Sequence, residues 1–219
     1  MSTSSQIELA SLLCSRLCHD LLSPVGALSN GLELLADETD PEMRDRCVEL
    51  LEQSARTSAD KLKFFRLAFG AAGGFGDAVP VEEAQEVVNA LASDGKPIDL
   101  NWALEGSSLP KPAVKVMLNL AHIALDALIR GGRLDIGAEV REGKVEIVVR
   151  ASGDRIAFDE VIGRALQGEL AAGEISSRTA AAHMIALVAE SAGGGLQYKV
   201  DDAAVVLGAV LPQPAGMIG

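Results

Sequence analysis

Apolar residues in the first 70 positions of the chain recur at helical spacing. One series steps by threes and fours through residues 13–35, and a second runs through residues 43–69. This spacing predicts two amphipathic helices, the first ending near Glu38 and the second beginning at Pro41 with Asp40 as its N-cap. The short connection makes them antiparallel. Because each helix carries more apolar surface than its partner covers, we expect two such hairpins to pair as a dimeric four-helix bundle.

The second part of the chain changes in character after the glycine-rich run 70–76, which we take as a domain boundary. We therefore divide the chain into a helical hairpin, residues 1–72, and a second domain, residues 77–213. Helical spacing predicts helices at 81–93, 112–130 and 175–192, and alternation predicts strands at 98–104, 133–141, 144–151, 196–200 and 204–211. The last four strands form two local hairpins. The mixed order predicts an α/β sandwich with helices on one face of the sheet.

Composition and charge exclude several classes of function. The net charge of −12, without a stripe rich in Lys and Arg, argues against nucleic acid as a partner. The first residues lack a signal peptide, and no stretch is apolar enough to span a membrane, so we expect a cytoplasmic protein. The odd number of cysteines fits a reducing compartment. Cys14 and Cys18 lie one helical turn apart, and we interpret them as core residues and not as metal ligands.

The first predicted helix contains candidate catalytic residues in the segment RLCHDLLSP, residues 16–24. If the leucines beside His19 face the core, its ring points outward. Asp20 is then placed to bind one ring nitrogen and leave the other free as a nucleophile. Pro24 removes one main-chain hydrogen bond and weakens the helix there. A solvated surface histidine without function is the competing interpretation.

The same residues resemble a known motif. His19-Asp20-Leu-Leu-Ser23-Pro24 is similar to the phosphoacceptor box of sensor histidine kinases, and the longer run RLCHDLLSPVGALSNGLELL resembles the ChpT-type histidine phosphotransferases of alphaproteobacteria. The likeness spans nearly the whole chain. It implies a homodimer with a degenerate kinase-like ATPase domain. It also implies that His19 accepts a phosphoryl group from the receiver domain of a hybrid histidine kinase and passes it to downstream response regulators.

The second domain departs from the kinase pattern at three motifs with which kinases hold ATP and Mg²⁺. Ile123 stands where a metal-binding asparagine is needed, and an isoleucine cannot ligate a hard cation. Ala151 replaces the aspartate that reads adenine, and residues 175–179 replace the glycine loop that wraps the phosphates. We therefore expect no cofactor or metal on this chain, with Mg²⁺ held by the receiver partner.

The hypothesis that follows is a phosphorelay through His19. Asp20 orients the ring and offsets its developing positive charge, and Ser23, one turn on, contacts the phosphoryl group or the partner. The predicted docking surface comprises Arg16, Leu22, Gly26 and Asn30. Two alternatives stay open at this point: an active ATP-dependent histidine kinase, and a noncatalytic dimeric adaptor.

Overall fold

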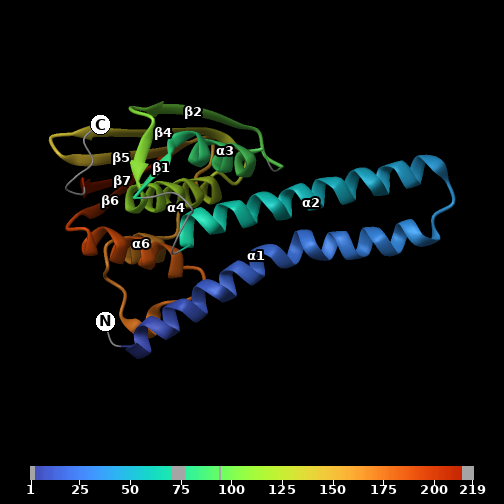
Figure 1. Cartoon of the computed structure of the whole chain (residues 1–219), viewed down its shortest axis with the longest axis horizontal. Coiled ribbons are helices and arrows are strands. Elements are labelled where there is room, and N and C mark those ends of the chain that lie inside the picture. Colours follow the sequence, from blue (N-terminus) through green and yellow to red (C-terminus); the bar gives the residue numbers. More distant parts are fainter. Residues whose placement is uncertain (1–2, 71–76, 94, 214–219) are drawn as a thin grey trace.

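The first two helices form a long antiparallel hairpin (Figure 1). The computed structural model describes residues 3–70, 77–93 and 95–213, and in it α1 spans Thr3–Asp37 and α2 spans Pro41–Phe69. The Asp40 side chain caps α2 by accepting a hydrogen bond of 3.0 Å from the main-chain N–H of Met43. The tip of the hairpin projects away from the rest of the molecule, so only its base packs on the second half of the chain.

The second half is an α/β sandwich, as its pattern predicts. Strand β2 pairs in parallel with β4, while the other neighbours pair antiparallel. Helices α3 (Val81–Ala92), α4 (Lys111–Ala127) and α6 (Ala180–Ser191) lie between the sheet and the hairpin (Figure 1). In spatial order the sheet consists of β2 (Ile98–Leu104), β4 (Gly132–Arg141), β5 (Lys144–Ser152), β7 (Ala204–Pro212) and β6 (Gly195–Val200).

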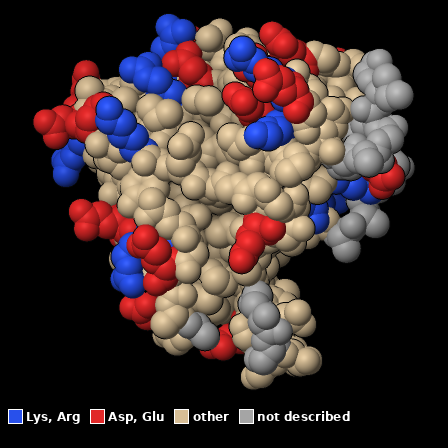
Figure 2. All heavy atoms as spheres, turned by 90° about the vertical axis from the view of Figure 1, so that its left-hand side faces the viewer, with Lys and Arg blue, Asp and Glu red and all other residues tan. Residues whose placement is uncertain are grey.

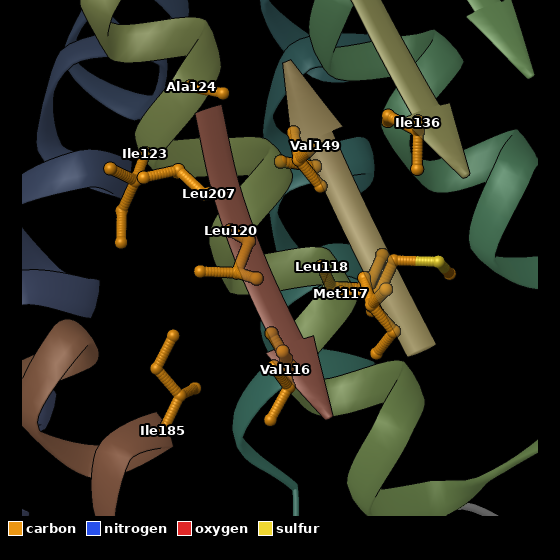
Figure 3. Packing of buried hydrophobic residues seen from close by; sticks show 14 of the residues in the cluster. Val116, Met117, Leu118, Leu120, Ile123, Ala124, Ile136, Val149, Ile185 and Leu207 are labelled. Carbon is orange, nitrogen blue, oxygen red and sulfur yellow. The ribbon is translucent and has the colours of Figure 1, made fainter. Parts of the chain in front are cut away.

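The main core lies between α4 and the sheet. Met117 and Leu120 on α4 are fully buried, and Figure 3 shows side chains of this helix beside those of β4, β5 and β7, with Ile185 of α6 nearby. Burying an aliphatic side chain of this size contributes about 1.5–3 kcal/mol. Because α4 is buried on several sides, it is the fixed element against which the hairpin base packs.

Several elements differ from the sequence prediction. Helix α6 begins at Ala180, five residues later than expected, because Ser176 and Thr179 hydrogen bond to each other and to local main chain, which competes with helix formation. Apart from Gly70, the run taken as a domain boundary lies outside the described residues. The pattern also missed short elements: β1 (Ala78–Pro80), β3 (Ser108–Pro110), α5 (Glu160–Leu166) and a 3₁₀ turn at Ala172–Glu174.

The hairpin leaves much apolar surface uncovered in a single chain. Cys14 and Cys18 are exposed, so our interpretation of them as core residues is wrong for the monomer. Nine of the fifteen large apolar side chains found exposed among the described residues belong to the two hairpin helices: Ile7, Leu22, Val25, Leu32, Leu34, Met43, Val48, Leu50 and Leu62.

Charged side chains lie mainly around the edge of the end of the molecule that Figure 2 shows. Lys and Arg lie next to Asp and Glu around a largely uncharged centre, and the positive side chains visible there do not gather into a patch. This face therefore offers no electrostatic basis for nucleic acid binding. Within the described ranges, no helix combines the length and the apolar character needed to cross a bilayer.

Candidate functional site

His19 lies on the outward face of α1, and its side chain is 86% exposed. Positions three, four, seven and eleven residues further along a helix share one stripe with it. The residues at these four positions are all exposed: Leu22, Ser23, Gly26 and Asn30. No atom lies within 4 Å of the point where a Cβ on Gly26 would stand, so this part of the stripe is low and open to an approaching molecule.

The ring of His19 is oriented by the next residue. Its Nδ1 lies 3.3 Å from Oδ1 of Asp20. Because an ionised carboxylate can only accept, the ring nitrogen that faces it carries the proton. The neutral ring then keeps its lone pair on Nε2, the nitrogen on the far side from Asp20. His19 is thus an exposed imidazole with one nitrogen held and the other free.

Asp20 is kept ionised by Arg16, one turn earlier. The Arg16 Nε donates to Asp20 Oδ2 at 2.7 Å, which leaves Oδ1 for His19. Partial burial alone would raise the pKa of Asp20, but the hydrogen bond and charge of Arg16 outweigh it and lower that pKa below its ordinary value. The same guanidinium also reaches Asp126 Oδ2 on α4, at 3.3 Å. Arg16 therefore links the segment around His19 to the second half of the chain.

The main chain at Asp20 is held from the opposite helix. In an α-helix the carbonyl of residue 20 accepts from the N–H of residue 24, but Pro24 has no N–H to give. The Asp20 carbonyl oxygen instead accepts a hydrogen bond of 3.1 Å from Lys61 Nζ on α2. Figure 1 shows α1 bending near the middle of its length. A proline bend and a lysine from the neighbouring helix thus fix the backbone next to His19.

A polar cavity of about 210 Å³ opens behind this segment, between the hairpin base and the sandwich. Arg16, Asp20 and Lys61 line it from the hairpin, and His122 and Asp126 line it from α4. The His122 ring lies 4.9 Å from the ring of Phe64, measured between centroids. Burial lowers the pKa of His122, although the charge of Asp126 opposes that shift. The surroundings of His122 therefore favour its neutral form.

The structure separates the predicted residues into two groups. His19, Leu22, Ser23, Gly26 and Asn30 share the exposed stripe, whereas Arg16 turns inward and is already paired with Asp20 and Asp126. Sequence reasoning missed three residues of this neighbourhood, Lys61, His122 and Asp126, because they are 41 or more positions away from Asp20 along the chain. The only sequence signal was Pro24, whose position implies an unpaired carbonyl at residue 20 without naming its donor.

Two of the positions that depart from the kinase motifs are packed among apolar side chains. Ile123 is 8% exposed and Ala151 is fully buried, both within the sandwich core. The Tyr198 ring is tilted against that of Phe158 at a centroid distance of 5.3 Å, and it lies so close to Gly163 that a Cβ there would collide with it. These residues do not fit a nucleotide or its metal ion: a buried isoleucine and alanine offer no ligand atoms.

Comparisons with known proteins find similarity to phosphotransferases. Residues 81–204 match the family model of the histidine phosphotransferase C-terminal domain. The protein phosphotransferase ChpT of Brucella abortus (strain 2308) is 39% identical over 151 residues, which cover 69% of this chain and 70% of that protein. The solved structure of a bacterial phosphotransferase is 31% identical, with a TM-score of 0.81 over 95% of this chain and 97% of the other.

Proposed function

The chain belongs to the histidine phosphotransferase family, and we propose from this premise that it relays a phosphoryl group between aspartates of receiver domains through His19. A hybrid histidine kinase supplies the group through its receiver domain, and downstream response regulators take it up. One observation carries the proposal: an exposed imidazole whose Nδ1 is held by an ionised aspartate and whose Nε2 faces solvent. A histidine of this kind on an open helix face can reach a reacting group on another protein.

The proposed step needs little machinery on this chain. Nε2 of the neutral ring attacks the phosphorus of the receiver's aspartyl phosphate, so an N–P bond forms while the P–O bond to the receiver carboxylate breaks. The carboxylate leaves with the electron pair and no proton moves. The product ring is a phosphoimidazolium with its Nδ1–H still facing Asp20, whose negative charge stabilises the new positive charge. Return of the group to another receiver reverses these steps.

The exposed stripe supports the docking part of the proposal. We propose that Leu22, Gly26 and Asn30 contact the receiver, and that Ser23, one turn beyond His19, contacts the phosphoryl group or the partner loop. Arg16 has a different role in this proposal, because its guanidinium is engaged by Asp20 and Asp126. It keeps Asp20 ionised, and so acts on the reaction through Asp20.

We propose that the chain uses neither ATP nor a metal ion of its own. The buried Ile123 and Ala151 support this, since they fill positions where a kinase needs an amide and a carboxylate. Charge on the transferring phosphoryl is then neutralised by the Mg²⁺ that the receiver brings. An active ATP-dependent kinase is correspondingly disfavoured. We place the relay in the cytoplasm, where the three free cysteines stay reduced.

We further propose that two chains pair through their hairpins as a four-helix bundle. The support is the apolar surface on both helices that a single chain leaves exposed, including Val25 and Leu32 on α1 and Leu62 on α2. Exposed apolar surface of this extent on a soluble monomer is unusual and marks an interface. A second copy of the same hairpin would cover it.

The decisive experiment follows labelled phosphate. Receiver domains encoded in the same genome are phosphorylated on aspartate and mixed one by one with the wild-type protein and with His19→Gln. We expect label to move to the wild type from at least one receiver and not to His19→Gln, while both proteins keep the same circular dichroism spectrum. The label should be stable in base and lost in acid, as expected for phosphohistidine.

Two outcomes would contradict the relay. Label that still reaches His19→Gln would place the acceptor elsewhere. A wild type that binds receivers but takes no label from any of them would identify the protein as an adaptor.

A further inference from the structure

We propose that Lys61 is a positioning residue for phosphoryl transfer, because it supplies the hydrogen bond that Pro24 removes from the phosphoacceptor segment. The inference rests on the proposed relay and extends it to a residue on α2 that touches neither the phosphoryl group nor the docking stripe. Lys61 acts on His19 through Asp20.

The carbonyl of Asp20 lacks its usual main-chain donor. Pro24 is buried inside α1 and cannot donate to the carbonyl of Asp20. Its ring also pushes that carbonyl away from the helix axis. A main-chain carbonyl left without a donor in a partly buried place is unfavourable, and such groups are nearly always satisfied in folded proteins. The bend therefore needs a donor from outside α1.

Lys61 on α2 supplies the donor for the Asp20 carbonyl. Its Nζ lies 3.1 Å from the Asp20 carbonyl oxygen, across the hairpin. Lys61 shares the inner face of α2 with Cys47 and Ser54, which precede it in steps of seven, and this face packs on α1. It is half-buried, so its hydrogen bond is shielded from competing water.

The Lys61 hydrogen bond reaches His19 through Asp20. Asp20 is held at two points, its carboxylate by Arg16 and its carbonyl by Lys61. With both contacts in place, Oδ1 lies 3.3 Å from His19 Nδ1, which turns the ring so that Nε2 points outward. Loss of the carbonyl contact lets the peptide next to His19 move, and small displacements of a reacting group slow transfer steeply.

The test compares Lys61→Met, which keeps the length of the side chain but has no donor, with Lys61→Arg, which keeps a donor. We expect Lys61→Met to lower the first-order rate of transfer from a phosphorylated receiver about tenfold, the size of effect that one lost charged hydrogen bond gives. The KM for the receiver should not change, because Lys61 lies off the docking stripe. Lys61→Arg should restore most of the rate. Lys63→Met, two positions on and exposed beside Asp60, is the matched control and should transfer at the wild-type rate.

A second variant separates positioning from folding. Pro24→Ala returns an N–H to residue 24, and with it a main-chain donor for the Asp20 carbonyl. In the Pro24→Ala background, Lys61→Met should therefore cost less than twofold in rate, so the two substitutions should be strongly non-additive. Nitrogen chemical shifts of the His19 ring give an independent measurement: Lys61→Met should move the Nδ1–H signal, and Lys63→Met should not.

The outcomes distinguish this inference from the relay itself. If His19→Gln takes up no label but Lys61→Met transfers at the wild-type rate, the relay stands and the role of Lys61 is refuted. If Lys61→Met is equally slow in both backgrounds, the loss has another cause and the proposal is again refuted. If His19→Gln accepts label, the relay through His19 is itself refuted, and the role of Lys61 is refuted with it.

Discussion

At the scale of single residues, two histidines of this chain show how surroundings decide chemistry. His19 stands in solvent with one nitrogen held by an ionised aspartate, a state suited to nucleophilic attack. His122 lies under Phe64 in the cavity behind it, where burial lowers its pKa. Both contribute to the same region of the molecule, but only His19 is accessible to another protein. Asp20 lies between the two histidines. Its Oδ1 faces His19, and the residue also lines the cavity that His122 lines.

The partly buried position of His122 predicts a pH dependence of stability. Its pKa in the folded protein lies below the ordinary value of 6.5, chiefly because of burial. Between these two values the unfolded chain binds a proton that the folded chain does not, so stability falls as pH falls through this window. We expect the free energy of unfolding to decrease from pH 7 to pH 5, by up to about 1.4 kcal/mol per pH unit from this residue.

The replacement His122→Phe keeps a ring against Phe64 and removes the titration. Urea unfolding at a fixed protein concentration, measured at pH 7 and pH 5, should therefore show a smaller loss of stability in His122→Phe than in the wild type. Some loss remains, because burial also lowers the pKa of His183. Equal losses in the two proteins would show that His122 is not the source.

At the scale of elements, α1 carries three different faces on one helix. The buried Pro24 and Gly31 mark the face against α2. At about 100° per residue, a second face follows the exposed Ile7, Cys14, Val25 and Leu32 in steps of seven and eleven, and it is apolar. The third face carries His19. The apolar face is therefore free to meet a second chain without covering His19.

Two glycines of α1 predict opposite effects on stability. A Cβ on Gly31 would stand 2.9 Å from Cδ2 of Leu51 on α2, whereas a Cβ on Gly26 would meet nothing within 4 Å. Gly26→Ala should raise the free energy of unfolding by about 0.5–1 kcal/mol, because alanine is the better helix former. Gly31→Leu should lower it by about 1–3 kcal/mol through overpacking between the helices. Urea titrations followed by circular dichroism measure both, and a stabilising Gly31→Leu would refute the close contact.

Sequence periodicity predicted the long elements well and the short or discontinuous features poorly. The hairpin and the five strands of the main sheet were all predicted, because each has enough residues to show its period. Strands β1 and β3 have three residues each and show none. At the site, His19 and Asp20 are neighbours in sequence and were predicted together. Lys61 and Asp126 were not, because contacts between distant positions leave no trace in spacing.

At the scale of the whole molecule, the sandwich holds only the base of the hairpin. Arg16 and Asp126 bridge the two parts beside the segment around His19, while the distal part of the hairpin stands free (Figure 1). The free part carries exposed Leu32 and Leu50, and the segment near His19 carries Val25. A partner hairpin would therefore add support where the sandwich gives none, and would leave the outward stripe accessible on both chains.

This arrangement predicts which single charge disrupts the proposed dimer. Val25 on the apolar face of α1 and Val148 on the open face of the sheet are each 50% exposed in one chain. Val25→Glu would bury a charge in the paired hairpins, a cost that breaks the interface, whereas Val148→Glu stays in water in either state. We expect light scattering after gel filtration to give a dimer mass for the wild type and Val148→Glu, and a monomer mass for Val25→Glu at micromolar concentration. A dimeric Val25→Glu would exclude this face as the interface, and a monomeric wild type would exclude the bundle itself.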